Sequence, residues 1–422
     1  MKLIRIIILF LAVSSLFLVS FFPQSINAQE NNFAEAIYSY YNQEYDRARE
    51  ILTDKALADE ISEEVIELQD YEVYYYLIRT EIALNNYRAA RDLLDNLAEA
   101  GYQPGELYWK LGEKYLNREG HFDSAQFDLA QDLIFKGVEL GHAGDIQRRD
   151  LAHAEYGLDN YQEAIDLLRE VSDDILTASD LSILARSNKK LGNESEAINY
   201  FERLIVRKPE DAGAHLDLAK IYYDSDEYEE AIDVLERGLE RSPGLNSLKS
   251  LLAKSYYQNE EYSLAMDYFS KVLERHNHNY EAHFYQGLIY KEWEEYDQAG
   301  ASWENATRYN PGYVNAYLEL GKLALTQDNH YRAISHFSRA LEENPDHGLS
   351  YYYLGKAFYK IEMFKSAEEE LQKALRRNPD IEKARELLAD IEEIMADMDG
   401  EELEETELQE ADIEEIEEEA EN

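Results

Sequence analysis

The sequence predicts an all-α solenoid built from helix–turn–helix repeats, and recurring columns of residues carry that prediction. In the second half of the chain, proline recurs at spacings of 34 residues or a multiple of 34. A fixed period of this length is typical of proteins that grow by stacking similar units instead of enlarging one core. The prolines are Pro209, Pro243, Pro311, Pro345 and Pro379, and Asn277 fills the missing place. The grid defines six units: 178–211, 212–245, 246–279, 280–313, 314–347 and 348–381.

Three further columns indicate how each unit packs. The twentieth position is alanine in all six units and the eighth is alanine or glycine, so two helices can approach closely there. The twenty-fourth position carries a large apolar side chain that fills the space beside these small residues. Proline at the thirty-second position ends the second helix, because it disfavours helical geometry in the residue before it. The large residues are Phe201, Leu235, Phe269, Trp303, Phe337 and Leu371.

Together these columns resemble the tetratricopeptide repeat family, as in the segment AYLELGKLALTQDNHYRAISHFSRALEENP at 316–345. The resemblance covers all six units. It implies a right-handed superhelical solenoid in which the first helix of each unit lines a concave groove.

The chain is expected to have five parts. The repeat pattern continues upstream of residue 178 in a degraded form, and a last helix after the repeats would cap the exposed apolar face. The C-terminal segment holds 15 acidic residues and no basic one, so repulsion predicts disorder there. The parts are a signal peptide at 1–28, divergent N-terminal repeats at 29–144, regular repeats at 145–381, a capping helix at 382–396 and an acidic disordered tail at 397–422.

The N-terminal segment has the pattern of an export signal. Lys2 and Arg5 precede an apolar run, and the small residue Ala28 offers a cleavage site before Gln29. This pattern predicts an exported protein, periplasmic or secreted, that makes no membrane contact once the signal is removed. An uncleaved membrane anchor is the alternative.

Composition excludes several kinds of chemistry. The net charge of −47 would repel nucleic acid. The chain has no cysteine, so disulfides and cysteine-ligated metals are ruled out. No phosphate-binding glycine loop, zinc-protease motif or nucleophile elbow occurs. We therefore expect no enzyme activity and no cofactor.

Histidines offer a weak indication of a metal site. His276, His278 and His283 are close in sequence, which suggests metal ligands. However, His283 and His215 occupy the inward-facing fourth column, so both are predicted to be core residues. No metal site is predicted.

The predicted groove is the candidate binding surface. In the family that the repeats resemble, positions 2, 5, 9, 12 and 13 of each unit face the groove, and here they hold nine cations and three anions. Interleaved cations and aromatic rings suit an extended, acidic and partly aromatic peptide. Alternatively, the cations only stabilise the helix C-termini. The family's carboxylate clamp does not fit, because the fifth column lacks lysine. The candidate residues are Arg186, Lys189, Lys190, Lys220, Tyr223, Lys254, Tyr257, Phe284, Lys322, Tyr352, Lys356, Tyr359 and Lys360.

The resulting hypothesis is a non-enzymatic adaptor of the cell envelope that holds an extended segment of another protein in this groove. The acidic tail at 397–422 is a second candidate occupant, because its charge complements the groove. The alternative function is a structural scaffold subunit of an envelope assembly, such as polysaccharide export or outer-membrane biogenesis, bound through its outer face.

Overall fold

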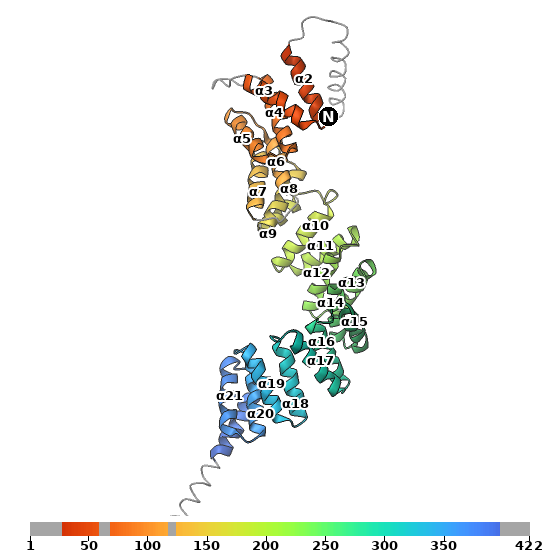
Figure 1. Ribbon diagram of the computed structural model, residues 1–422, viewed down its shortest axis with the longest axis vertical. Coiled ribbons are helices and arrows are strands. Elements are labelled where there is room, and N and C mark those ends of the chain that lie inside the picture. The colour runs from red at the N-terminus through yellow and green to blue at the C-terminus, as the bar shows by residue number, and fades with distance from the viewer. Residues whose placement is uncertain (1–27, 59–67, 117–123, 397–422) are drawn as a thin grey trace, which may run out of the picture. The chain divides into compact units, whose positions relative to one another are not determined.

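The computed structural model describes residues 28–58, 68–116 and 124–396, and all regular secondary structure in these ranges is α-helical (Figure 1). The predicted all-α fold is thereby confirmed. Apart from Ala28, the predicted signal peptide lies outside the described residues, and so does the predicted tail at 397–422. Among the described helices, none combines the length and the apolar character needed to cross a membrane.

The chain forms two compact units, Met1–Lys208 and Pro209–Asn422, and each is described by itself. In the first unit, consecutive helices pair into hairpins that follow the predicted repeats from residue 29 onward. Its helices are α2 (Ala28–Tyr41), α3 (Tyr45–Ala58), α4 (Leu68–Ala83), α5 (Tyr87–Glu99), α6 (Gly105–Leu116), α7 (Ser124–Glu139), α8 (Asp145–Gly157), α9 (Tyr161–Arg169), α10 (Ala178–Lys190) and α11 (Glu194–Arg207).

The second unit contains five hairpins among its described residues, one for each predicted repeat from 212 to 381, and a final helix over residues 382–396. Neighbouring hairpins pack in chain order (Figure 1). The helices are α12 (Ala212–Asp224), α13 (Tyr228–Arg241), α14 (Asn246–Gln258), α15 (Tyr262–Arg275), α16 (Tyr280–Glu292), α17 (Tyr296–Tyr309), α18 (Val314–Thr326), α19 (His330–Glu343), α20 (Gly348–Lys360) and α21 (Phe364–Arg377).

The eighth and twenty-fourth columns meet inside each hairpin, as the sequence predicts. A Cβ atom added at Gly287 would lie 2.4 Å from Nε1 of Trp303, and one added at Gly321 would lie 2.4 Å from Cε1 of Phe337. These distances are shorter than any van der Waals contact, so the aromatic rings occupy the space that a methyl group would need. The small residues therefore set the distance between the two helices of a hairpin.

Most turns inside the hairpins use the same backbone device. The fifteenth residue of the unit has a positive φ, for example 62° at Glu294 and 61° at Asp226. This left-handed geometry reverses the chain between the helices, and it is unfavourable for residues with a side chain. The other left-handed residues at this position are Gln43, Asn85, Asp159, Gly192, Glu260, Asp328 and Glu362.

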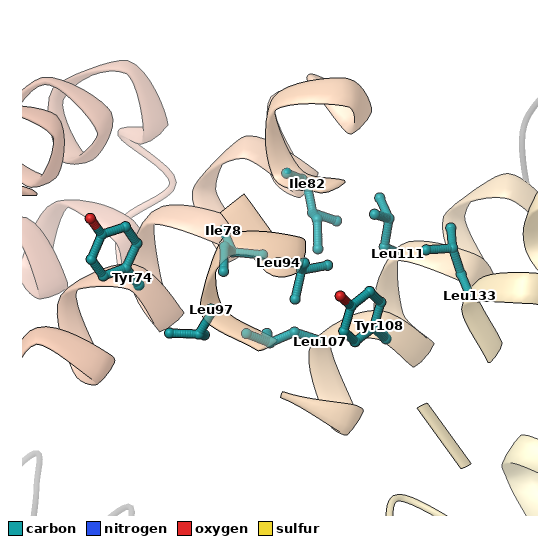
Figure 2. Packing of buried hydrophobic residues seen from close by; sticks show 10 residues of the cluster. Tyr74, Ile78, Ile82, Leu94, Leu97, Leu107, Tyr108, Leu111 and Leu133 are labelled. Atoms are coloured by element: carbon teal, nitrogen blue, oxygen red, sulfur yellow. The ribbon is translucent and has the colours of Figure 1, made fainter. Parts of the chain in front are cut away.

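The first unit has its own hydrophobic core, in which α4, α5, α6 and α7 contribute side chains (Figure 2). Farther along this unit, a buried carboxylate joins α8 to α10. Asp180 accepts hydrogen bonds from Arg149 Nε at 2.7 Å and from the Thr177 backbone at 2.7 Å, and lies 2.8 Å from His153 Nε2. Although burial alone would raise it, these hydrogen bonds hold the pKa of Asp180 well below its usual range.

The last described helix covers the end of the repeat stack. Ala384 and Ile391 are fully buried, and they share a hydrophobic cluster with Leu371 of α21 and Tyr352 of α20. The helix over 382–396 thus gives the final hairpin the apolar neighbour that a further repeat would otherwise supply.

Candidate functional site

The first helices of the second unit are α12, α14, α16, α18 and α20, and all of them except α16 carry a ninth-position lysine of the predicted groove. Two of these lysines lie above the tyrosine ring at the sixth position of the next first helix. The Nζ atom of Lys254 is 5.6 Å from the ring centroid of Tyr285, and that of Lys322 is 5.1 Å from the ring centroid of Tyr353. An ammonium group over an aromatic face gains about 0.5–2 kcal/mol. The repeat period therefore places the same cation–tyrosine contact at two points, two hairpins apart.

Acidic side chains pair with two of the candidate cations, Lys254 and Lys322, and also with Lys291, which occupies the twelfth position of its unit. Lys254 Nζ is 2.9 Å from Glu281 Oε2. Farther along, Glu319 lies between two lysines: Oε2 is 3.3 Å from Lys291 Nζ, and Oε1 is 2.7 Å from Lys322 Nζ. Glu319 is only 9% exposed. It occupies the sixth position, which the sequence analysis did not assign to the groove, so this carboxylate was missed. Its spacing of three residues from Lys322 was the available signal.

These contacts continue from one first helix to the next. Gln258 Nε2 donates a hydrogen bond of 3.5 Å to the Tyr223 hydroxyl, and the Tyr257 ring meets Tyr285 edge-on at 5.4 Å. With the lysine contacts above, they connect α12 to α20 without a break. We call this surface the first-helix face. It comprises Lys220, Tyr223, Lys254, Tyr257, Glu281, Tyr285, Lys291, Glu319, Lys322, Tyr353, Lys356, Tyr359 and Lys360.

The twelfth-position tyrosines of the first-helix face also brace the hairpin turns. Each is half-buried and packs against an aromatic ring at the start of the second helix. The pairs are Tyr223–Tyr228 at 5.6 Å, Tyr257–Tyr262 at 5.6 Å and Tyr359–Phe364 at 5.9 Å. Burial raises the pKa of Tyr257 to about 12, and the carboxylates of Glu292 and Glu319 add to the shift. The hydroxyl of Tyr257 therefore stays protonated well into the alkaline range and can donate a hydrogen bond.

Two predicted groove residues are part of the core instead. Phe284 is 8% exposed and Tyr352 is 7% exposed, and each belongs to a hydrophobic cluster. Trp303 Nε1 donates a hydrogen bond of 3.1 Å to the Phe284 carbonyl, which fixes this part of α16 against α17. The fifth-position side chains of Phe284 and Tyr352 therefore pack in the core between helices. The prediction that they offer contact area to a bound peptide is wrong.

The remaining predicted cations differ in exposure. Lys220 and Lys360 are exposed and Lys356 is half-buried. In the described parts of the chain no ion pair is found for these three lysines, unlike Lys254 and Lys322. In the first unit, α10 carries the other predicted cations: Arg186 and Lys189 are half-buried, and Lys190 is exposed.

The two histidines predicted to be core residues differ in burial. His215 is 2% exposed, and its Nδ1 lies 3.0 Å from the Asp211 carbonyl, as expected of a core residue. His283 is only half-buried and stacks on Tyr309 at 5.4 Å. Within residues 28–58, 68–116 and 124–396, no group of three or more histidine or acidic side chains is placed to hold a metal ion.

The second-helix side carries a cavity of about 200 Å³ between α17, α18 and α19. Its lining includes Leu320 and Leu323, and also Glu304 and Arg332, which form an ion pair 2.7 Å long. Gly300 lines the cavity as well, and it is the one small residue in the twenty-first column. That column reads Ile198, Ile232, Met266, Gly300, Ile334 and Glu368.

Comparison with solved structures finds several repeat proteins. The chain is similar to a tetratricopeptide repeat protein from Parabacteroides merdae, with 17% identity, a TM-score of 0.47, and coverage of 58% of this chain and 97% of that one. YrrB, described as a TPR protein with an unusual peptide-binding site, has 24% identity, a TM-score of 0.37, and coverage of 44% and 96%. MamA has 21% identity, a TM-score of 0.37, and coverage of 38% and 95%. No curated protein sequence matches the chain.

Family models identify the repeats directly. One model, described as a tetratricopeptide repeat, matches residues 190–255 and 324–391, and a second with the same description matches residues 294–348. These segments are tetratricopeptide repeats, as their residue columns predict. Repeats of this kind typically form non-catalytic scaffolds that bind other proteins or peptides.

Proposed function

We propose that this chain is a non-enzymatic adaptor of the cell envelope that binds an extended segment of another protein along its first-helix face. The observation that carries the proposal is the row of lysines set over tyrosines, repeated at Lys254 and Lys322. The export pattern of residues 1–28 supports the envelope location in this proposal.

The chemistry of this surface favours an acidic and partly aromatic segment. Lys220 lies on α12, and Lys356 and Lys360 lie on α20, which are the first and the last helix of the face. Among the described residues, none of these three lysines forms an ion pair. Between them the charges are largely balanced, and half-buried tyrosines supply rigid contact area with hydroxyl donors. A segment with acidic groups toward its ends and aromatic or polar groups between them would match this distribution.

Charge reversal tests the proposal. Replacing Lys220, Lys254, Lys322 and Lys356 by Glu is expected to weaken binding of a fluorescent acidic, tyrosine-containing peptide by on the order of 100-fold, because four attractions become repulsions. Anisotropy titration measures the affinity and circular dichroism checks the helix content. The matched control reverses four second-helix cations, Arg203, Arg237, Lys271 and Arg339, each paired with a nearby acid. Equal losses in the two variants would mean that overall charge, and not the first-helix face, governs binding.

A structural scaffold bound through the second helices is the second candidate function. The cavity at Gly300 favours it, because a cavity lined by both apolar and charged side chains can receive an anchoring side chain of a partner. Gly300→Met introduces the residue that the preceding unit carries in the same column, Met266, and the new side chain is expected to fill the cavity. A Cβ atom at Gly300 would lie 3.2 Å from Cδ2 of Leu323. This atom is the flexible end of the leucine side chain, so Leu323 can adjust.

Pull-downs from an envelope extract with the Gly300→Met variant and with the fourfold lysine reversal distinguish the two candidate functions. The adaptor proposal expects Gly300→Met to keep the proteins that wild type captures, and the lysine reversals to lose them. The opposite pattern would favour the scaffold.

A further inference from the structure

Glu319 differs from the other acidic residue of the first-helix face because it is nearly buried and forms ion pairs with two lysines. Its two oxygens are engaged separately, Oε2 with Lys291 of α16 and Oε1 with Lys322 of the same helix α18. The side chain of Glu319 is 11% exposed, whereas those of Lys291 and Lys322 are 45% and 28% exposed. Two ammonium groups therefore reach toward solvent around one inward carboxylate.

The sixth column shows that a carboxylate is not required there by the fold. The corresponding residues in the adjacent hairpins are Tyr285 and Tyr353, which pack against Phe269 and Phe337. Burying a carboxylate is costly unless cations compensate it. Glu319 is thus held at this position by Lys291 and Lys322 and not by apolar packing of the kind its column neighbours make.

Within the ion-paired group of Glu319, Lys291 and Lys322 the charges do not cancel. One carboxylate faces two ammonium groups, so these three side chains together carry one net positive charge. By contrast, Glu281 pairs with Lys254 alone, and its side chain is 42% exposed. A second carboxylate is therefore attracted to the Lys291–Lys322 pair, but it can contact both Nζ atoms only if Glu319 moves away.

We infer that Lys291 and Lys322 form a carboxylate-binding subsite, and that Glu319 fills it until an acidic side chain of the bound segment takes its place. The identity of that segment rests on the proposed function, whereas the subsite itself does not. The exchange replaces one set of ion pairs by another of the same kind, so an isolated anion gains little from it. Only a segment with further contacts on the first-helix face gains enough to displace Glu319, which makes Glu319 a determinant of specificity.

The subsite can be tested with acetate, without any peptide. In the full-length Glu319→Ala variant the two lysines lose their shared carboxylate, and the variant is expected to melt at a lower temperature than wild type. Sodium acetate should then raise the melting temperature in a saturable manner, beyond the effect of sodium chloride at equal ionic strength, because a ligand that binds only the folded state stabilises it. Wild type should show no such difference between the two salts.

Two control variants make the result specific. Glu304→Ala removes a carboxylate that pairs with Arg332 on the second-helix side, and it should respond equally to acetate and chloride. Adding Lys291→Met to Glu319→Ala should abolish the acetate effect, because one of the two ammonium groups is then missing. If acetate and chloride act alike on Glu319→Ala, the subsite does not exist.

A peptide measurement with Glu319→Gln covers the case in which the alanine variant fails to fold, since the amide keeps the size of the side chain. The acidic peptide is expected to bind this variant roughly tenfold more tightly than wild type, because no charge-assisted contact of Glu319 has to be broken first. Acetate rescue without peptide binding in any variant would support the subsite and count against the proposed function. Peptide binding that Glu319→Gln leaves unchanged, with no acetate effect, would overturn the subsite and leave the proposed function standing.

Discussion

A single hydrogen atom at Gly287 determines how α16 and α17 pack. The indole of Trp303 lies where a methyl group would be, and its Nε1 is hydrogen-bonded to the Phe284 carbonyl. In the preceding hairpin the same two positions hold Ala253 and Phe269, both buried. Gly with Trp and Ala with Phe are therefore two solutions to the same packing problem.

This equivalence predicts a compensating pair of substitutions. Gly287→Ala should lower the free energy of unfolding by about 1 kcal/mol, because overpacking costs about 1–3 kcal/mol and the helix propensity of alanine returns about 1 kcal/mol. Trp303→Phe alone should also destabilise, through lost volume and a lost hydrogen bond. The double variant recreates the Ala253–Phe269 pair, so urea denaturation should show a loss at least 1 kcal/mol smaller than the sum of the single losses. Additive losses would mean that the two residues do not share one space.

Residue columns were enough to predict these packing pairs, because a small residue and a large residue recur at two fixed positions of each unit in the sequence. The orientation of the fifth and sixth positions was not predictable in the same way. Phe284 and Tyr352 turn into the core, whereas Glu319 turns toward the lysines. These orientations depend on which neighbouring side chains each helix packs against, and a column of residue types does not contain that information.

At the scale of the element, the turn inside each hairpin has an intrinsic weakness. Glu294 adopts a φ of 62°, and a side chain in this region costs about 1–2 kcal/mol. Of the turns described, only the one at Gly192 uses glycine at this fifteenth position.

Glycine at such a turn should stabilise the fold. Glu294→Gly is expected to raise the free energy of unfolding by about 0.5–1 kcal/mol, since the relief of strain exceeds the entropy that glycine loses on folding. The matched control is Glu295→Gly, which removes the same charge at the next residue, where φ is −86°. It should leave stability unchanged or lower it, and thermal melting of the two variants gives the comparison. A gain of equal size in both would trace the effect to charge and not to backbone geometry.

The division of each unit into two helices and a turn was predictable because proline and the small columns recur with one period. The hairpins before residue 178 were predicted from fewer matching residues, yet they keep the same turn position, as Asn85 and Asp159 show. Local backbone geometry was retained there while the packing columns drifted.

For the whole molecule, the charge distribution raises the question of what occupies the first-helix face in the absence of a partner. We propose that the acidic tail at 397–422 competes for it. The segment carries 15 acidic residues and the apolar residues Leu403, Leu408, Ile413 and Ile416. Its 26 residues can span up to about 85 Å when extended, which is enough to pass several hairpins. Tethering would give it an effective concentration on the order of millimolar.

Truncation after Ala396 tests this competition. The shortened protein is expected to bind the acidic peptide several-fold more tightly at low salt, and added tail peptide should reverse the gain. A full-length control in which the four apolar tail residues are replaced by serine keeps the charge and removes the hydrophobic contacts. Unchanged affinity after truncation would show that the tail only solubilises the protein.

The lysine–tyrosine contacts have an evolutionary consequence, because they join different repeats. The pairs that hold a hairpin together, such as Gly287 with Trp303, lie within one 34-residue unit. The contacts that build the first-helix face, such as Lys254 with Tyr285 or Lys291 with Glu319, cross from one unit to the next. Duplication or deletion of a whole unit in the gene would leave every hairpin intact and create new neighbours at a single junction. Such a chain can change what it recognises while each hairpin keeps its own internal packing, so descendants of one ancestor can diverge in partner without a loss of foldability.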